Sequence, residues 1–338
     1  MMRRPLITVL AAALLCSPLA SLSAHADEVR SRMIRFGYGL NENSNQGRAA
    51  KLFAEEVAKA SEGKLKMRTY GAASLGSDDQ MQSALIGGAQ EMMVGSTATL
   101  VGITKEMAVW DTPFLFSSAE QADAVLDGPV GRQVMDKLEE KGLVGLVYWE
   151  NGFRNMTNNV RPITKLEDFS GIKLRVMPNP VFLETFKLMG ANAVPLPFSE
   201  LFTALETKAV DGQENPFNTI LSSKFYEVQK YLTVTNHVYS PWIVTASKRW
   251  WDGLSQTERD ILLQAAKKAR DFERQDTREE AAKALAQLES NGMQVNRISS
   301  EQVQSMRETA QPAIKQVIDS VGQPLFDSVQ AELAKAPQ

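Results

Sequence analysis

Hydrophobic and polar positions along the chain alternate between a period typical of strands and a period typical of helices. A short β-type run over 33–38 precedes a segment in which apolar residues recur every three or four positions, and Gly63 ends that helical pattern. Residues 64–70 alternate apolar and charged side chains as a half-buried strand does, and a helix is expected over 77–85. This repeated order of strand and helix predicts parallel sheets covered by helices and joined by right-handed crossovers.

The middle of the chain continues this pattern and then changes. One helix is expected over 119–141, and the nearly continuous apolar run 143–149 is typical of a strand buried on both faces. The polar, turn-rich stretch 150–162 follows, and it predicts a domain boundary. A new strand over 171–176 then begins the next part of the chain.

The last third of the chain predicts long helices. Ser255 and Glu258 have the spacing of a capping box, and good helix formers continue to about Leu288, which is roughly 45–50 Å of helix. Because one domain is shorter than that, we expect the helix to pack across two domains. A bent helix or two shorter helices are the alternative. Further helices are expected over 299–334, with Ser299 as an N-cap.

The length of the chain predicts two domains. Residues 27–338 exceed the ~250–300 residues at which single cores stop growing. We assign 27–152 to domain I and 153–240 to domain II. About 241–280 are expected to return to domain I, and about 281–338 to domain II.

The first 26 residues predict export. Two arginines precede an apolar run that is shorter than the ~20 residues of a membrane span, and Ala24-His25-Ala26 places small residues where signal peptidase cleaves. The mature chain is therefore expected to begin near Asp27, in the periplasm. A lipid anchor on Cys16 is not expected, because a leucine precedes it where lipoprotein signals carry a small residue.

Composition narrows the possible chemistry. Cleavage would leave no cysteine and one histidine, His237, which we interpret as a packed or hydrogen-bonding residue. Neither a zinc site of cysteine and histidine nor a nucleophile motif such as G-x-S-x-G is present, and no metal or cofactor is expected. The chain has 37 basic and 40 acidic residues, a formal net charge of −3, and no basic run, which argues against nucleic acid.

Two arginines lie where a solvated helix face would not place them. Arg154 follows the buried strand in a turn, and Arg175 lies within the strand 171–176 on the face opposite its apolar residues. Ligands of open α/β sheets bind beyond the carboxyl ends of strands, and a guanidinium meets a carboxylate through two parallel hydrogen bonds. Pairing of each arginine with a surface acid is the alternative.

A polar turn is predicted at 211–216, after a helix for which Ser199 is the expected N-cap. Asn215 in this turn can donate to a carboxylate and accept from a hydroxyl, which makes it a candidate to orient a ligand. Asp-Gly and Asn-Pro are also ordinary turn signals, so these residue types alone favour a structural role.

Four linked segments resemble, in order and spacing, the tripartite ATP-independent periplasmic (TRAP) solute-binding proteins of the DctP type. They are Gly171-Ile-Lys-Leu-Arg-Val, Pro197-Phe-Ser-Glu-Leu, Asp211-Gly-Gln-Glu-Asn-Pro and Lys224-Phe-Tyr-Glu-Val-Gln-Lys-Tyr. The resemblance extends over nearly the whole mature chain, including Leu75-Gly-Ser-Asp78 and Pro113-Phe-Leu-Phe116. It implies a two-domain α/β clamshell of the periplasmic-binding-protein type, without a catalytic step, across which the long helix would pack.

The resemblance also implies roles for individual residues. The arginine matching Arg175 makes the main salt bridge to the ligand carboxylate, and the residue matching Asn215 assists it. The position of Arg154 commonly contributes a second positive contact. Phe198 matches an aromatic residue that shapes the cleft.

The far end of the cleft departs from the relatives that bind sialic acid. Residues matching Ser96 and Gly39 are a glutamate and an asparagine in those proteins, and Glu150 stands where they have a tyrosine. Sialic acid is therefore not expected. Ser96, Asn41, Asp78 and Glu150 are candidates for contacts to the distal end of another ligand.

We therefore expect a monomeric binding protein that closes over a small carboxylate and delivers it to the integral-membrane subunits of a TRAP transporter. C4-dicarboxylates are the first expectation because Arg154 and Arg175 offer two cations, and sugar acids such as uronates follow closely. A carbohydrate-acid-processing enzyme with Glu150 and Asp78 as a carboxylate pair is an alternative of another class. A sensory binding protein with the same cleft is a further alternative.

Overall fold

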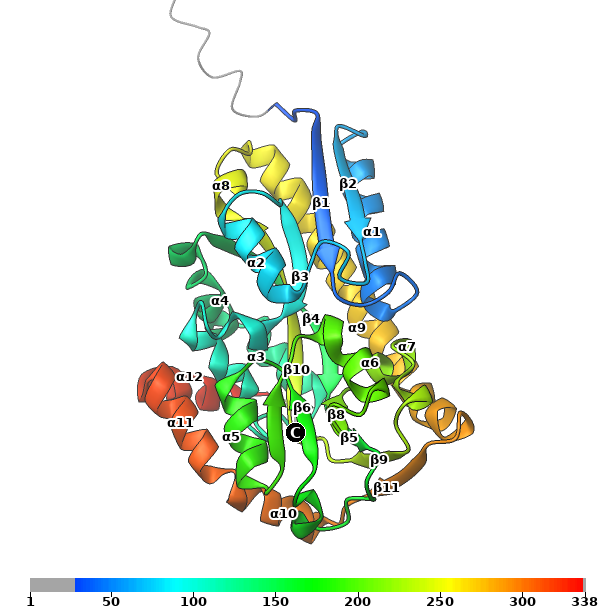
Figure 1. Ribbon diagram of the computed structural model, residues 1–338. Coiled ribbons are helices and arrows are strands. Elements are labelled where there is room, and N and C mark those ends of the chain that lie inside the picture. Colours follow the sequence, from blue (N-terminus) through cyan, green and yellow to red (C-terminus); the bar gives the residue numbers. More distant parts are fainter. Residues whose placement is uncertain (1–27, 337–338) are drawn as a thin grey trace, which may run out of the picture.

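Two β-sheets form the centres of two lobes in the computed structural model, which describes residues 28–336 (Figure 1). The sheet of the first lobe has the strand order β2 (Leu65–Tyr70), β1 (Arg32–Tyr38), β3 (Met92–Ser96), β10 (Tyr239–Ser247) and β4 (Leu143–Phe153). The sheet of the second lobe has the order β11 (Gln294–Arg297), β9 (Tyr231–Val234), β5 (Asn155–Asn158), β8 (Gly212–Asn215), β6 (Lys173–Val176) and β7 (Asn192–Pro195). The expected two-domain α/β fold is confirmed.

Both sheets are mixed, whereas the sequence pattern predicted parallel sheets. β10 runs antiparallel to β3 and β4, and β5 runs antiparallel to β8 and β9. The reason is that one residue separates β4 from β5 and four residues, 235–238, separate β9 from β10, so the chain crosses between the lobes from strand to strand. A strand that returns from the other lobe enters its sheet from the opposite end, and local periodicity carries no information about that direction.

The helices of the first lobe follow the predicted pattern with one division. They are α1 (Asn45–Ala60), α2 (Asp78–Ile86), α3 (Ala119–Leu126), α4 (Pro129–Asp136) and α8 (Lys248–Trp251), with 3₁₀ turns at Thr97–Leu100, Lys105–Asp111 and Glu139–Lys141. The expected single helix over 119–141 is broken at Gly128-Pro129. Pro129 is the first residue of α4, and a proline there cannot donate to the preceding turn.

The second lobe carries shorter helices around its sheet. They are α5 (Pro180–Leu188), α6 (Phe198–Glu206) and α7 (Phe217–Ser222), with 3₁₀ turns at Leu166–Phe169 and Phe225–Glu227. The expected cap of α6 was Ser199, but the helix begins one residue earlier, at Phe198, with Pro197 at the N-cap. Phe198 is thereby held at the first turn of a helix, next to the sheet of its lobe.

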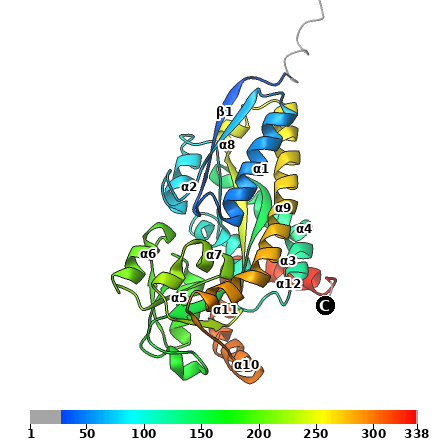
Figure 2. The same ribbon diagram turned by 90° about the vertical axis from the view of Figure 1, so that its right-hand side faces the viewer.

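One long helix, α9 (Gln256–Ser290), connects the lobes (Figure 2). Its capping box is formed as predicted: Ser255 Oγ accepts from Glu258 N at 3.2 Å, and Glu258 Oε2 accepts from Ser255 N at 2.8 Å. The helix packs against α1 and β4 of the first lobe and against α7 of the second. The helix is continuous, so the alternative of two shorter helices is wrong.

The C-terminal helices also reach both lobes. They are α10 (Ser300–Thr309), capped by Ser299 as predicted, α11 (Gln311–Val321) and α12 (Gln323–Leu333). α11 packs on α5 of the second lobe and on the 3₁₀ turn Lys105–Asp111 of the first. α12 packs on α3 and α4, where Leu325 and Val329 join the core of the first lobe. The expected return of the whole stretch 281–338 to the second domain therefore does not describe α12.

Two findings bear on the membrane. Within residues 28–336, no helix is both long and apolar enough to cross a bilayer. The predicted signal peptide, residues 1–26 with Cys16, lies outside the described part of the chain.

Candidate functional site

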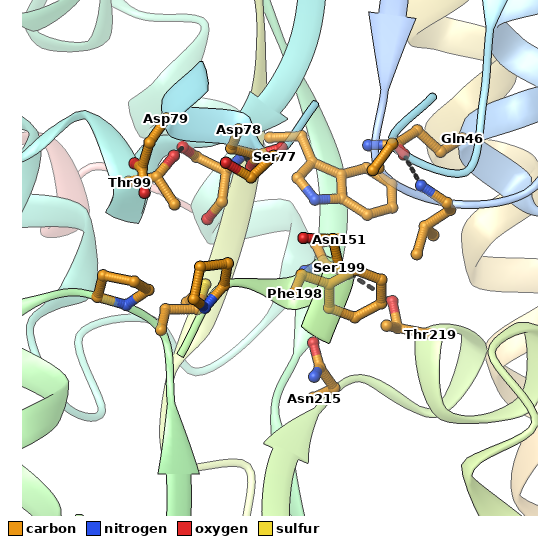
Figure 3. Close-up of a pocket in the computed structure, with 18 of the residues that line it drawn as sticks. Gln46, Ser77, Asp78, Asp79, Thr99, Asn151, Phe198, Ser199, Asn215 and Thr219 are labelled. Carbon is orange, nitrogen blue, oxygen red and sulfur yellow. Dashed lines mark hydrogen bonds between the residues drawn. The ribbon is translucent and has the colours of Figure 1, made fainter. Parts of the chain in front are cut away.

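A cavity lies between the two lobes (Figure 3), and Arg154, at the point where β4 passes into β5, is among its lining residues. The first lobe contributes Asp78, Ser96 and Thr99 to its wall, and the second contributes Arg175, Phe198 and Asn215 among other residues. Residues of both lobes therefore form the cavity together.

Arg175 enters this cavity from the strand β6. Its neighbours Leu174 and Val176 are buried in the core of the second lobe, so the alternation of the strand directs Arg175 to the other face. Its Nε donates to Leu196 O at 2.8 Å, but Nη1 and Nη2 are buried without an acceptor in residues 28–336. Burial lowers the pKa of Arg175 to about 9, which leaves it a cation at neutral pH.

Asn215 lies at the end of β8, in a segment that the sequence predicted to be a turn. The segment is a strand because it pairs on both sides: Asn215 lies opposite Asn155 on β5, and Gln213 lies opposite Arg175 on β6. Asn215 Nδ2 donates to Gln213 Oε1 at 2.6 Å, and Gln213 Nε2 donates to Thr157 Oγ1 at 2.9 Å. These bonds hold the Asn215 side chain at the cavity wall, which it lines together with Arg175.

Arg154 borders the same cavity, but its guanidinium is bound to a protein carboxylate. It lies between β4 and β5, fully buried, and its Nη2 donates to Glu214 Oε1 at 2.8 Å while Nε contacts Oε2. His237 Nε2 lies 3.0 Å from the same Oε2. Burial acts to raise the pKa of Glu214, but Arg154 and His237 lower it below its usual value. The second cation expected from the sequence is therefore already neutralised.

The opposite wall of the cavity is acidic. Asp78 is the first residue of α2, which Ser77 caps, and its Oδ2 accepts from Ser96 N at 3.0 Å. Burial raises the pKa of Asp78 to about 6. A Cβ atom on Gly39 would stand 3.8 Å from Asp78 Oδ1 and 4.0 Å from Phe198 Cδ1, so the absence of a side chain at Gly39 leaves room between the two lobes.

Two expected site residues lie outside this cavity. Glu150 Oε2 accepts from Arg278 Nε of α9 at 2.8 Å, on the side of the strand away from the cavity. Asn41 Nδ2 donates to Ser222 O at 2.8 Å, which links the first lobe to α7. The proposed carboxylate pair of Glu150 and Asp78 is therefore not assembled.

Other lining residues carried no signal in the sequence. Thr99, Met177 and Trp242 border the cavity, and Thr219 Oγ1 donates to Asn151 Oδ1 at 2.9 Å across the gap between the lobes. They become neighbours only through the strand crossings. In the described part of the chain, no three His, Cys, Asp or Glu side chains converge to hold a metal ion.

A buried arginine thus faces a cavity between two lobes, and the family comparison identifies the fold. Residues 36–320 match the family described as bacterial extracellular solute-binding protein, family 7, or DctP. The chain belongs to this family. The resemblance to TRAP solute-binding proteins is confirmed, and the chain is a solute-binding protein for small organic acids rather than an enzyme.

Named relatives cover most of this family 7 protein. The sugar acid binding protein DctPAm of Advenella mimigardefordensis, solved in complex with galactonate, is 49% identical, with a TM-score of 0.89 over 91% of this chain and 99% of that chain. The 2,3-diketo-L-gulonate-binding periplasmic protein YiaO of Escherichia coli is 36% identical over 84% of this chain and 86% of its own length. The C4-dicarboxylate-binding periplasmic protein DctP of Rhodobacter capsulatus is 30% identical over 99% and 100%.

Proposed function

We propose that this protein captures a hydroxylated monocarboxylate, such as a sugar acid, and delivers it to the membrane subunits of a TRAP transporter. The observation that carries the proposal is on the buried Arg175, whose donors Nη1 and Nη2 have no acceptor within residues 28–336. An uncompensated cation in a closed cavity is costly, and one carboxylate supplies both missing acceptors in the geometry that guanidinium favours. Asn215 lies on the neighbouring strand of the same sheet, and we propose that it orients the ligand by hydrogen bonding to its carboxylate or to a hydroxyl group.

The same geometry changes the order of the two ligand classes expected from the sequence. The sequence favours C4-dicarboxylates because Arg154 and Arg175 offer two cations. In the structure, however, the Arg154 guanidinium binds Glu214 and is not available to a ligand. Among the residues that the structure describes, 28–336, one cation of the cavity wall is available, and this favours a ligand with one carboxylate and hydroxyl groups. The relative in complex with galactonate, at 49% identity, supports this order over relatives with bound succinate, one of which is 31% identical.

Export and delivery complete the proposal. YiaO and DctP are periplasmic by name, and residues 1–26 have the pattern of a signal peptide, so we propose that the mature protein works in the periplasm as a monomer. The lobes are proposed to move as two bodies about the β4–β5 and β9–β10 crossings, with α9 bending between them. Opening separates the walls of the cavity and releases the acid to the membrane subunits.

Calorimetric titration of the mature protein tests the proposal. Galactonate is expected to bind more tightly than succinate. Arg175→Ala is expected to weaken galactonate binding by roughly two to three and a half orders of magnitude, because it removes one partner of a buried ion pair. Arg175→Lys recovers little because an ammonium lacks the two-pronged geometry. Arg132→Ala, which removes an exposed arginine remote from the cavity, is the matched control. If Arg175→Ala binds within tenfold of wild type and melts normally, the assignment fails.

A further inference from the structure

The carboxyl group of Asp78 faces the cavity from the wall opposite Arg175. Its Oδ2 accepts one hydrogen bond, from Ser96 N at 3.0 Å, whereas Oδ1 borders the space that Gly39 leaves open beside Phe198. Within the described residues 28–336, Asp78 is therefore held in place through Oδ2, and Oδ1 is available to the distal end of a ligand whose carboxylate lies on Arg175.

We propose that Asp78 selects the class of acid that the cleft accepts, favouring a terminal hydroxyl when it is ionised and admitting a terminal carboxylate when it is neutral. This inference rests on the proposed function, in which Arg175 holds the first carboxylate. An ionised Asp78 accepts a charge-assisted hydrogen bond from a hydroxyl. The same ionised group repels a second carboxylate. A terminal carboxylate therefore binds best when Asp78 carries a proton that it can donate to the ligand.

The charges around Asp78 support a change of state near neutral pH. Asp79 on the same helix disfavours the ionised form, Arg175 across the cavity favours it, and the Ser96 amide of β3 donates to it. Gly39 and Phe198, which border Oδ1, carry no charge. Burial is the largest influence, and it raises the pKa of Asp78 to about 6. Asp78 is thus ionised above that pH and neutral below it.

The matched ligands for a test are galactonate and galactarate, which differ only in the group at the distal end of the chain. Galactonate carries a hydroxyl there and galactarate a second carboxylate, and both carboxylates of galactarate stay ionised at pH 5.5. Titration calorimetry at pH 5.5 and pH 8.0 would give the ratio of their dissociation constants for wild type. Between these values the neutral fraction of a group that titrates near pH 6 changes by roughly 80-fold.

We therefore expect galactarate to bind up to roughly 80-fold more tightly at pH 5.5 than at pH 8.0, while galactonate changes only a few-fold in the opposite direction. Asp78→Asn is expected to bind galactarate at pH 8.0 about as tightly as wild type does at pH 5.5, with no pH dependence. Asp79→Asn, which removes the neighbouring charge, is the control. It shifts the midpoint of the change to lower pH but does not abolish it.

The outcomes separate this inference from the proposed function. If Arg175→Ala still binds both ligands, the proposed function fails. Two results would overturn only the role of Asp78, provided that Arg175→Ala loses both ligands. In one, the ratio of the galactarate and galactonate dissociation constants of wild type is independent of pH. In the other, the pH dependence of this ratio is the same in folded Asp78→Asn as in wild type. Melting temperatures of both variants at each pH verify that the folded state is compared.

Discussion

Arg154 and Glu214 form a fully buried ion pair at the junction of the lobes, with Arg154 Nη2 donating to Glu214 Oε1 at 2.8 Å. Arg154 Nη2 also donates to the backbone carbonyl of Glu214, which ties the end of β4 to β8. His237 contacts the same carboxylate. The pair therefore supports the crossing between the lobes, and Arg154 does not have a free fork for a ligand.

Arg154→Ala is expected to destabilise the protein by about 3–5 kcal/mol, because it leaves the Glu214 carboxylate buried without its cation. Urea unfolding measures this. The double variant Arg154→Met with Glu214→Gln should recover part of the loss, since neither charge then remains. An Arg154→Ala protein of nearly wild-type stability that had lost its ligand would instead mark Arg154 as a direct ligand contact.

Asn41 is expected to act on the closed state rather than on the ligand, because its side chain bonds to Ser222 O in the other lobe. A hydrogen bond of this kind contributes about 0.5–1.5 kcal/mol, so Asn41→Ala should weaken binding roughly 2- to 12-fold. Stopped-flow kinetics should place the change in the dissociation rate, and by the same factor for every ligand. A factor that varies between galactonate and succinate would show a direct contact.

Glu273 on α9 is expected to make stability fall with rising pH. It is fully buried, its Oε2 accepts from Glu150 N at 2.8 Å, and burial raises its pKa from 4.5 to about 8. Between these two values the folded chain holds a proton that the unfolded chain has lost, so each pH unit removes up to about 1.4 kcal/mol. Glu273→Gln removes this contribution. Urea unfolding from pH 5 to 8 should show the stability of Glu273→Gln relative to wild type increasing with pH, and a constant difference would contradict the assignment.

Export predicts the N-terminus of the mature protein. Because Ala24-His25-Ala26 fits the preference of signal peptidase, protein recovered from the periplasm should begin at or near Asp27. N-terminal sequencing with intact-mass measurement decides this. A retained leader, or a mass increase from lipid on Cys16, would contradict it.

Features decided within a few residues could be predicted from the sequence alone. The capping box of Ser255 and Glu258, the helix α1 with its apolar stripe, and the placing of Arg175 on a strand opposite its apolar neighbours all follow from local hydrogen bonding and periodicity. The family could also be predicted, because the order and spacing of the four linked motifs along the chain are specific to it.

The tertiary structure alone decided which polar groups face the ligand. Arg154 and Glu150 were candidate ligand contacts, but each binds a distant residue of the protein instead. Glu214, 60 residues away, binds Arg154, and Arg278, 128 residues away, binds Glu150. The segment with Asn215 is a strand because β5 and β6 pair with it, although its residue types are those of a turn. Local signals act over three or four residues, whereas a buried charge is satisfied by whichever partner the fold brings opposite it. Of the two arginines expected to bind the ligand, Arg154 is paired with Glu214, and the terminal nitrogens of Arg175 have no acceptor in the described stretch 28–336.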